Sequence, residues 1–231
     1  MQILPSIVIN YKKIKLEVIS FFSKNKIIIL PLLFVLFYIS FYFLIDFSTQ
    51  SLVAHDEGLY ARRARLIESS DNWFSPPFTT PHHKTLGSYW FIALCIRFFG
   101  NSELALRLPS IFSSFLCLIS SYLIALQITN KKTALISVLS LSAMPIWIQY
   151  SRYASPDFPF ILSILLAILF FLKSIDYSSF IKKYSYIFLS GFFISISFFI
   201  RSYMAFVPLL GLAPFIIFHL FRKEYIFKIY F

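Results

Sequence analysis

The chain has 231 residues, of which 58% are hydrophobic and 13% are charged, and its mean hydropathy is +0.77. Soluble domains are about 45–50% apolar and about 25% charged, so this composition excludes an ordinary soluble domain as well as a disordered chain. The net charge of +11 would suit nucleic acid, but most of it flanks apolar runs, where anionic membrane lipids attract it. We therefore expect membrane lipids, and no nucleic acid, as partners.

The first long apolar run covers residues 27–45 and follows a basic segment with Lys12, Lys13, Lys15, Lys24 and Lys26. Its length suffices to cross a hydrocarbon core of about 30 Å as a helix. The run is too long for the apolar part of a secretory signal, and no clean cleavage site follows it. We interpret it as an uncleaved anchor, preceded by a cytoplasmic segment of residues 1–26.

Further apolar runs cover residues 106–128, 134–149, 158–172, 184–200 and 203–221. These runs predict an all-α fold, a polytopic helical bundle with about six transmembrane helices. Residues 89–99 are also apolar but too few to cross, and are expected to form a helix at the membrane surface. Counting them as a span would move every later basic loop outside, against the tendency of Lys and Arg to remain in the cytoplasm. We thus expect a multi-pass inner-membrane protein with a cytoplasmic N-terminus.

The first outer loop, residues 46–105, is the longest loop and has the densest polar content, so we expect function to lie there. Asp56 and Glu57 stand together in it, shortly before Arg62 and Arg63. Two interpretations of the acidic pair stay open. The carboxylates stabilise the positive end of a helix that starts there, or they form a site for a metal ion or an acceptor hydroxyl beside the arginines.

A proline-rich stretch of this loop leads to His82, His83 and Lys84. The two histidines are either solvated surface residues or ligands of a metal ion. Lys84 is the only lysine that this topology places outside, and an ammonium group at headgroup level can bind a lipid phosphate. The alternative for Lys84 is an interface lysine whose charged end reaches water.

The second outer loop contains Arg152 and Asp157. An acid that enters an apolar span is costly and by default marks a functional site, although Asp157 would also suit the N-cap of the helix that follows. Arg201 falls at the third outer turn. We interpret it as an anchor of the helix end or a phosphate contact rather than as a catalyst.

The order of these features resembles a known superfamily. An Asp-Glu-x-x-Tyr motif begins the long outer loop, a lysine precedes an aromatic interfacial helix, and Gly100-x-x-Glu103-x-x-x-Arg107-x-Pro109 follows. This combination resembles the GT-C membrane glycosyltransferases, within them the branch of aminoarabinose and protein O-mannosyl transferases, over residues 27–172. The resemblance implies transfer of a sugar, with inversion, from a polyprenyl-phosphate carrier to a lipid, glycan or protein acceptor outside the cytoplasmic membrane.

The resemblance also implies roles for particular residues. Asp56, Glu57 and Asp157 match as catalytic acids, and Lys84 matches as the contact to the carrier phosphate. The family's Glu-Lys-Pro stretch falls on His83-Lys84-Thr85, so the lysine matches and the glutamate and proline do not. A divalent metal ion is the one cofactor that the resemblance implies, and two alternatives stay open: His83 replaces the glutamate and binds the ion with Asp56, or the metal site is absent. The arginines expected to help bind the carrier phosphate are Arg62, Arg63, Arg152 and Arg201.

Two other interpretations remain beside this one. Family members usually have more spans, so we expect residues 27–231 to be an incomplete transmembrane domain, and an inactive fragment is one alternative. The other is a non-catalytic membrane protein, such as a transporter or a flippase component. Transporters place polar groups near the middle of the membrane, whereas the charges here stand at the ends of spans, which favours chemistry at the outer surface.

Overall fold

A computed structural model describes residues 52, 56–76, 85–177, 179–208 and 210, all of which belong to one compact unit, Asp46–Phe231. The described residues form helices and loops without a strand, which confirms the all-α prediction. In chain order the helices are α3 (Asp56–Glu68), α4 (Gly87–Phe99), α5 (Glu103–Ile128), α6 (Lys131–Ser142), α7 (Pro145–Tyr150), α8 (Asp157–Asp176), α9 (Phe180–Arg201) and the 3-10 helix η1 (Ser202–Ala205).

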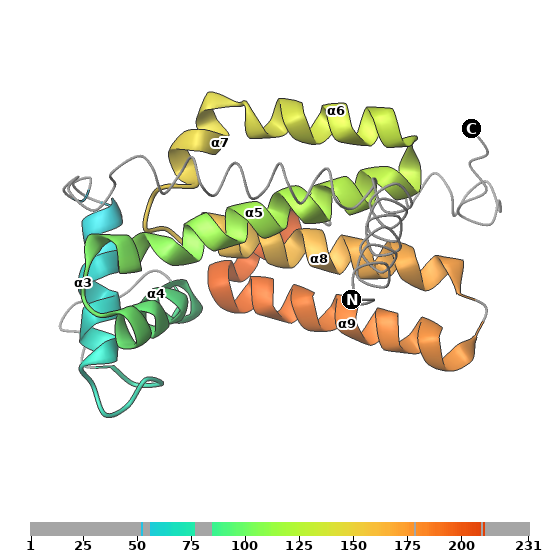
Figure 1. Ribbon diagram of the computed structural model, residues 1–231. Coiled ribbons are helices and arrows are strands. Elements are labelled where there is room, and N and C mark those ends of the chain that lie inside the picture. The colour runs from blue at the N-terminus through green and yellow to red at the C-terminus, as the bar shows by residue number, and fades with distance from the viewer. Residues whose placement is uncertain (1–51, 53–55, 77–84, 178, 209, 211–231) are drawn as a thin grey trace, which may run out of the picture. The chain divides into compact units, whose positions relative to one another are not determined.

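Three helical segments of the described chain are long and apolar enough to cross a membrane: Glu103–Ile128, Asp157–Ile175 and Phe180–Pro208. They confirm three of the expected spans. The helix α5 has 26 residues and is therefore about 39 Å long. It packs against α8, which packs in turn against α9 (Figure 1). The expected span 27–45 and most of 203–221 lie outside the described residues.

The expected span 134–149 is wrong as a single helix. The structure forms two helices there, α6 and α7, separated at Ala143 and Met144. Pro145 is the reason, because proline has no N–H to continue a helix and forces the residue before it into an extended conformation. Met144 indeed has φ −66° and ψ 128°. With 12 residues, α6 is about 18 Å long and too short to cross alone.

The helices α3 and α4 pack against each other through a buried apolar face on each. Alanines without exposed surface lie in this contact, so the two backbones approach closely. The buried residues recur at helical spacing: Tyr60, Ala61, Ala64 and Ile67 on α3, and Tyr89, Ile92, Ala93 and Ile96 on α4. The 13-residue α4 confirms the short helix expected around 89–99. Its opposite face exposes Phe91, Leu94 and Phe98.

The link between α4 and α5 explains part of the glycine-to-proline motif. Gly100 ends α4 with φ 83° and ψ 168°, a conformation that only glycine adopts readily. Its N–H donates to the carbonyl of Ile96 at 2.8 Å. Ser102 then caps α5, since its hydroxyl accepts a hydrogen bond from the N–H of Ala105 at 3.2 Å. These two residues set the turn that brings α5 back along α4.

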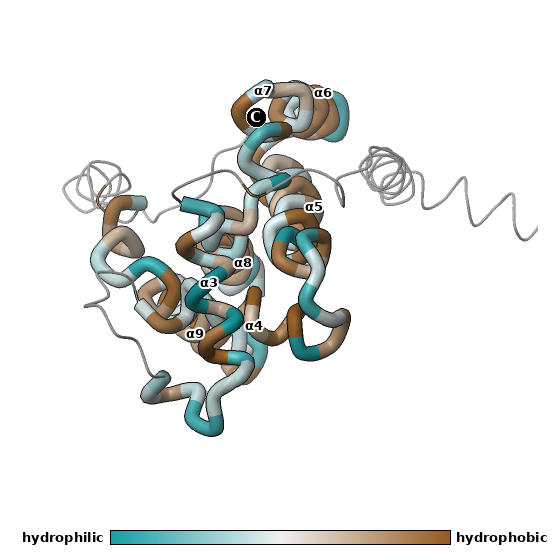
Figure 2. The backbone as a smooth tube through the Cα atoms, turned by 90° about the vertical axis from the view of Figure 1, so that its left-hand side faces the viewer, coloured by the Kyte–Doolittle hydropathy of each residue, from teal (hydrophilic) through white to brown (hydrophobic). Residues whose placement is uncertain are grey.

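The helix directions gather the predicted outer loops at one end of this unit. The helices α3 and α4, the start of α5, the α7–α8 loop and the end of α9 lie together there (Figure 1). Figure 2 looks onto this end and shows hydrophilic residues along α3 and in the adjoining loops. The lysine-bearing turns α5–α6 and α8–α9 lie at the opposite end. We call the end with α3, α4, the start of α5, the α7–α8 loop and the end of α9 the loop-bearing end.

Candidate active site

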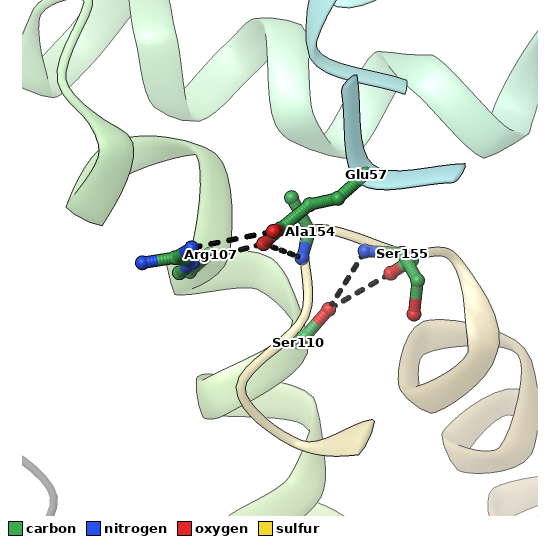
Figure 3. A network of polar contacts seen from close by, with 5 residues as sticks. All are labelled: Glu57, Arg107, Ser110, Ala154 and Ser155. Carbon is green, nitrogen blue, oxygen red and sulfur yellow. Dashed lines mark hydrogen bonds and ion pairs between the residues drawn. The ribbon is translucent and has the colours of Figure 1, made fainter. Parts of the chain in front are cut away.

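Glu57 lies in the first turn of α3 and is enclosed, with 3% of its surface exposed. Its carboxylate accepts two hydrogen bonds from the guanidinium of Arg107 on α5, one from Nε at 2.8 Å and one from Nη2 at 3.2 Å (Figure 3). Arg107 is itself only 4% exposed. The two side chains thus form a buried, bidentate ion pair that joins α3 to α5.

The same carboxylate also holds the α7–α8 loop. The backbone N–H of Ala154 donates to Oε1 of Glu57 at 2.9 Å. One residue further on, the hydroxyl of Ser110 donates to the carbonyl oxygen of Ser155 at 2.8 Å and accepts from its N–H at 3.4 Å (Figure 3). Two consecutive loop residues are therefore fixed to α3 and α5. The loop continues directly into Asp157.

Asp157 is the first residue of α8, and its carboxylate accepts a hydrogen bond from the guanidinium of Arg201, the last residue of α9. The two side chains are 31% and 29% exposed. The alternative of Asp157 as an N-cap is wrong, because Pro156 occupies that position and no side-chain cap bond forms. This ion pair is partly exposed, unlike the enclosed pair of Glu57 and Arg107.

The remaining predicted residues of this end have different surroundings. Asp56 and Arg62 are exposed on α3, and Arg152 is half-buried in the α7–α8 loop. Arg63 instead turns into the contact between α3 and α4, where its Nη1 donates to the hydroxyl of Tyr89 at 2.7 Å and its guanidinium lies 5.6 Å from the centre of that ring. Arg63 therefore helps to hold α4 on α3.

The two predicted ligands of the loop, His83 and Lys84, lie outside the described residues. Within the part of the chain that the structure describes, no three His, Cys, Asp or Glu side chains come together as metal ligands. The described residues thus give no fit for a divalent ion. The metal site of His83 and Asp56 stays a prediction.

Sequence reasoning did not assign a role to Arg107, Ser110 or the Ala154 amide. Arg107 was visible only as a motif residue, 50 positions after Glu57, and nothing in that spacing identifies its partner. A charged residue at the second position of the predicted apolar run 106–128 was the available signal, since such a residue needs a partner when it is enclosed. Backbone donors such as that of Ala154 leave no sequence signal.

The loop-bearing end has a defined chemical capacity. Asp56 and Asp157 are carboxylates within reach of solvent, and a carboxylate can accept a proton from a hydroxyl or orient it. Arg62, Arg152 and Arg201 supply permanent positive charge at the same end, where it suits a phosphate group. Glu57 differs from the other acids, because it is enclosed and both of its oxygens already accept hydrogen bonds. Its geometry suits positioning rather than contact with a substrate.

The fold and this polar end define a multi-pass membrane protein with charged groups gathered at one end of its helices. Residues 83–230 match the family model described as dolichyl-phosphate-mannose-protein mannosyltransferase. The chain belongs to this family.

Two relatives and one solved structure resemble this chain over most of this chain's own length. It is 30% identical over 149 residues to an uncharacterized protein of Aquifex aeolicus, covering 63% of this chain and 28% of the relative. It is 28% identical over 197 residues to the undecaprenyl phosphate-alpha-4-amino-4-deoxy-L-arabinose arabinosyl transferase of Erwinia tasmaniensis, covering 84% and 35%. The crystal structure of ArnT from Cupriavidus metallidurans in the apo state matches with a TM-score of 0.70 at 18% identity, covering 83% and 36%.

These likenesses differ in what they establish. The structural match shows the fold alone, because its sequence identity of 18% is too low to establish more. The chain spans roughly a third of the length of these proteins, with 28%, 35% and 36% of each covered. The family model begins at residue 83 and therefore covers α4 to α9 but not α3.

Proposed function

We propose that this chain transfers a sugar from a polyprenyl-phosphate carrier to a lipid, glycan or protein acceptor at the outer face of the cytoplasmic membrane. Membership of the family supports this proposal, and so does the name of the Erwinia relative, which specifies a sugar carried on undecaprenyl phosphate. The observation that carries it is the partly exposed pair of Asp157 and Arg201, next to the loop that the carboxylate of Glu57 holds in place.

The proposed chemistry follows from the charged groups of the predicted outer loops. The leaving group is a lipid phosphate, so its departure is favoured by the positive charges of Lys84, Arg62, Arg152 and Arg201. Asp56 is proposed to deprotonate or orient an acceptor hydroxyl. If the acceptor is a lipid A phosphate, which is already ionised, no base is needed and Asp56 acts by positioning.

Asp157 is proposed to act beside Asp56, in contact with the reacting groups. Its neighbour Arg201 offers several N–H donors in a planar fork, more than one carboxylate oxygen uses. The same guanidinium can therefore hold Asp157 and contact the carrier phosphate. Glu57 and Arg63 are proposed as positioning residues, since both are enclosed between helices.

The transporter or flippase alternative is not favoured by these findings. The family of the chain is named for a transferase, and Asp157 and Arg201 lie at the ends of the spans α8 and α9. We further propose that residues 1–26 are cytoplasmic, that 27–231 form the transmembrane domain, and that the loop-bearing end faces outward in the inner membrane. Reporter fusions after residue 26 and within the loop 46–105 test this topology, because opposite sidedness would contradict it.

The proposed activity is tested in membranes that contain the chain and a radiolabelled polyprenyl-phosphate sugar. Wild-type chain is expected to pass label to a lipid, glycan or protein fraction, whereas Asp56→Asn and Asp157→Asn are expected not to. Asp71→Asn is the matched control, since Asp71 is an exposed acid beyond the end of α3. Absence of transfer by well-inserted wild-type chain would refute transfer by this chain alone.

A further inference from the structure

The last turn of α9 has an unusual hydrogen-bond arrangement. The carbonyl oxygen of Ile200 accepts a hydrogen bond from the hydroxyl of Thr85 at 2.6 Å and another from the hydroxyl of Ser88 at 2.6 Å. A carbonyl oxygen has two lone pairs, so both are used. The final carbonyls of a helix have no partner within the helix, and Ile200 is fully buried, so these hydroxyls satisfy a group that water cannot reach.

Gly87 makes this contact possible. A Cβ atom at Gly87 would lie 2.5 Å from the carbonyl oxygen of Phe199 and 2.5 Å from a ring carbon of the same residue. Any side chain there would push the start of α4 away from the end of α9. The sequence Thr85-Leu86-Gly87-Ser88 thus combines a close approach at its glycine with two hydroxyls that reach the carbonyl. We call these four residues the α4–α9 clasp.

The clasp fixes the backbone immediately before Arg201. The next residue, Ser202, has φ 51° and ψ −130°, so α9 ends sharply there. The N–H of Ser202 donates to the carbonyl of Phe198, so the backbone is hydrogen-bonded on both sides of Arg201. The side chain of Arg201 reaches Asp157 at the start of α8, and its Nε atom is enclosed with no hydrogen-bond partner among the described residues.

We propose that Thr85 and Ser88 are positioning residues for Arg201. Through the carbonyl of Ile200 they set the guanidinium against Asp157, with donors left for an anionic phosphate group on the carrier lipid. This inference rests on the proposed function for its ligand, but its geometric part concerns only the pair of Arg201 and Asp157. A displacement of about 1 Å at such a group can cost about a hundredfold in rate.

Removal of both hydroxyls tests the proposal. The variant Thr85→Val/Ser88→Ala keeps similar side-chain volumes but leaves the carbonyl of Ile200 without its donors. Thr85→Ser keeps the hydroxyl and is the conservative rescue. Ser195→Ala is the matched control, because the hydroxyl of Ser195 donates to the carbonyl of Gly191 at 3.0 Å on an exposed part of the same helix. Thr85→Val alone serves if the double variant does not insert.

The first measurement is the affinity of the detergent-purified full chain for sugar-free polyprenyl phosphate. Binding is monitored through the rise in unfolding temperature that the lipid causes. We expect the affinity to fall about tenfold in Thr85→Val/Ser88→Ala, the equivalent of one weakened hydrogen bond to a charged group. Thr85→Ser and Ser195→Ala should bind as wild type does. In an Arg201→Gln background, loss of the hydroxyls should cause no further decrease. An equal decrease in both backgrounds would show a merely structural role and overturn the proposal.

The second measurement needs no ligand. The coupling free energy between Asp157 and Arg201 is obtained from the unfolding temperatures of wild type, Asp157→Asn, Arg201→Gln and the double variant. The same cycle is repeated in the Thr85→Val/Ser88→Ala background, which lacks the two hydroxyls. We expect coupling in the presence of Thr85 and Ser88 and none in their absence. Unchanged coupling would overturn the positioning role. Lost coupling in a chain that binds no polyprenyl phosphate would instead support the positioning role and refute the proposed carrier.

Discussion

The buried pair of Glu57 and Arg107 allows a sharp test of how the loop-bearing end is held together. The perturbation is a cycle of three variants: Glu57→Gln, Arg107→Leu and the two combined. Glu57→Gln keeps the shape of the side chain and an oxygen for the N–H of Ala154, but it takes away the charge that faces the guanidinium. Arg107→Leu takes away both donors that the carboxylate accepts from α5.

The magnitude follows from burial. With 3% and 4% of their surfaces exposed, neither charge can regain water when the other is removed. Breaking such a pair from one side costs about 3–5 kcal/mol, which for a chain of this size lowers the unfolding temperature by roughly 6–20 °C. The double variant leaves no enclosed charge from the pair and retains an acceptor for Ala154. We therefore expect it to be more stable than either single variant.

The assay is thermal unfolding of the purified chain in detergent, monitored through tryptophan fluorescence. Arg62→Leu is the control, because Arg62 is an exposed arginine on the same helix as Glu57, and a change within about 0.5 kcal/mol is expected there. Additive losses in the double variant would refute the reasoning, since they would show that the two side chains do not depend on each other. Small losses in the single variants would show that the pair is open to water.

Three further predictions concern α4, its end and α9. Gly87→Ala should lower stability by about 1–3 kcal/mol in thermal unfolding, because the added methyl meets a backbone carbonyl, whereas Gly191→Ala, which has open space, should raise it by about 0.5–1 kcal/mol. Gly100→Ala should cost about 1–2 kcal/mol by the same measurement, since φ is 83° there; an unchanged unfolding temperature would contradict the strained turn. Burial raises the pKa of the Cys95 thiol, so in a Cys117→Ala chain alkylation at pH 8 should be slower than that of a free thiol. Folding then favours the neutral thiol. The free energy of unfolding should therefore decrease as the pH rises above about 8.5, the pKa of a cysteine thiol in an unfolded chain.

Much of the fold follows from composition and local pattern. The long apolar runs identified α5, α8 and α9 as spans, because a bilayer requires about 20 apolar residues in one helix. The short run before Gly100 was recognised as a separate helix for the same reason. The break at Pro145 was missed, although the proline was visible, because hydropathy alone does not register the loss of one backbone N–H.

The candidate site was predicted only in part. Asp157 was selected because an acid that enters an apolar span is costly, and Arg201 was selected as a helix-end anchor or phosphate contact. Their mutual contact over 44 positions was not predicted. Glu57 was expected to be catalytic like Asp56, yet one step along α3 turns it by about 100° into the protein, where it binds Arg107. Thr85 and Ser88 carried no sequence signal, because hydroxyls are common in loops.

The sequence by itself predicted a membrane protein, the three spans that the structure forms as α5, α8 and α9, and the ends of apolar runs at which charges stand. Those properties depend on residues close together in the chain and on their transfer from water to hydrocarbon. Only the tertiary structure decided which charges are enclosed and which face solvent. Helix packing brings residues that are distant in the chain within hydrogen-bond distance of one another. It pairs Glu57 with Arg107, Asp157 with Arg201, and two hydroxyls with the carbonyl of Ile200.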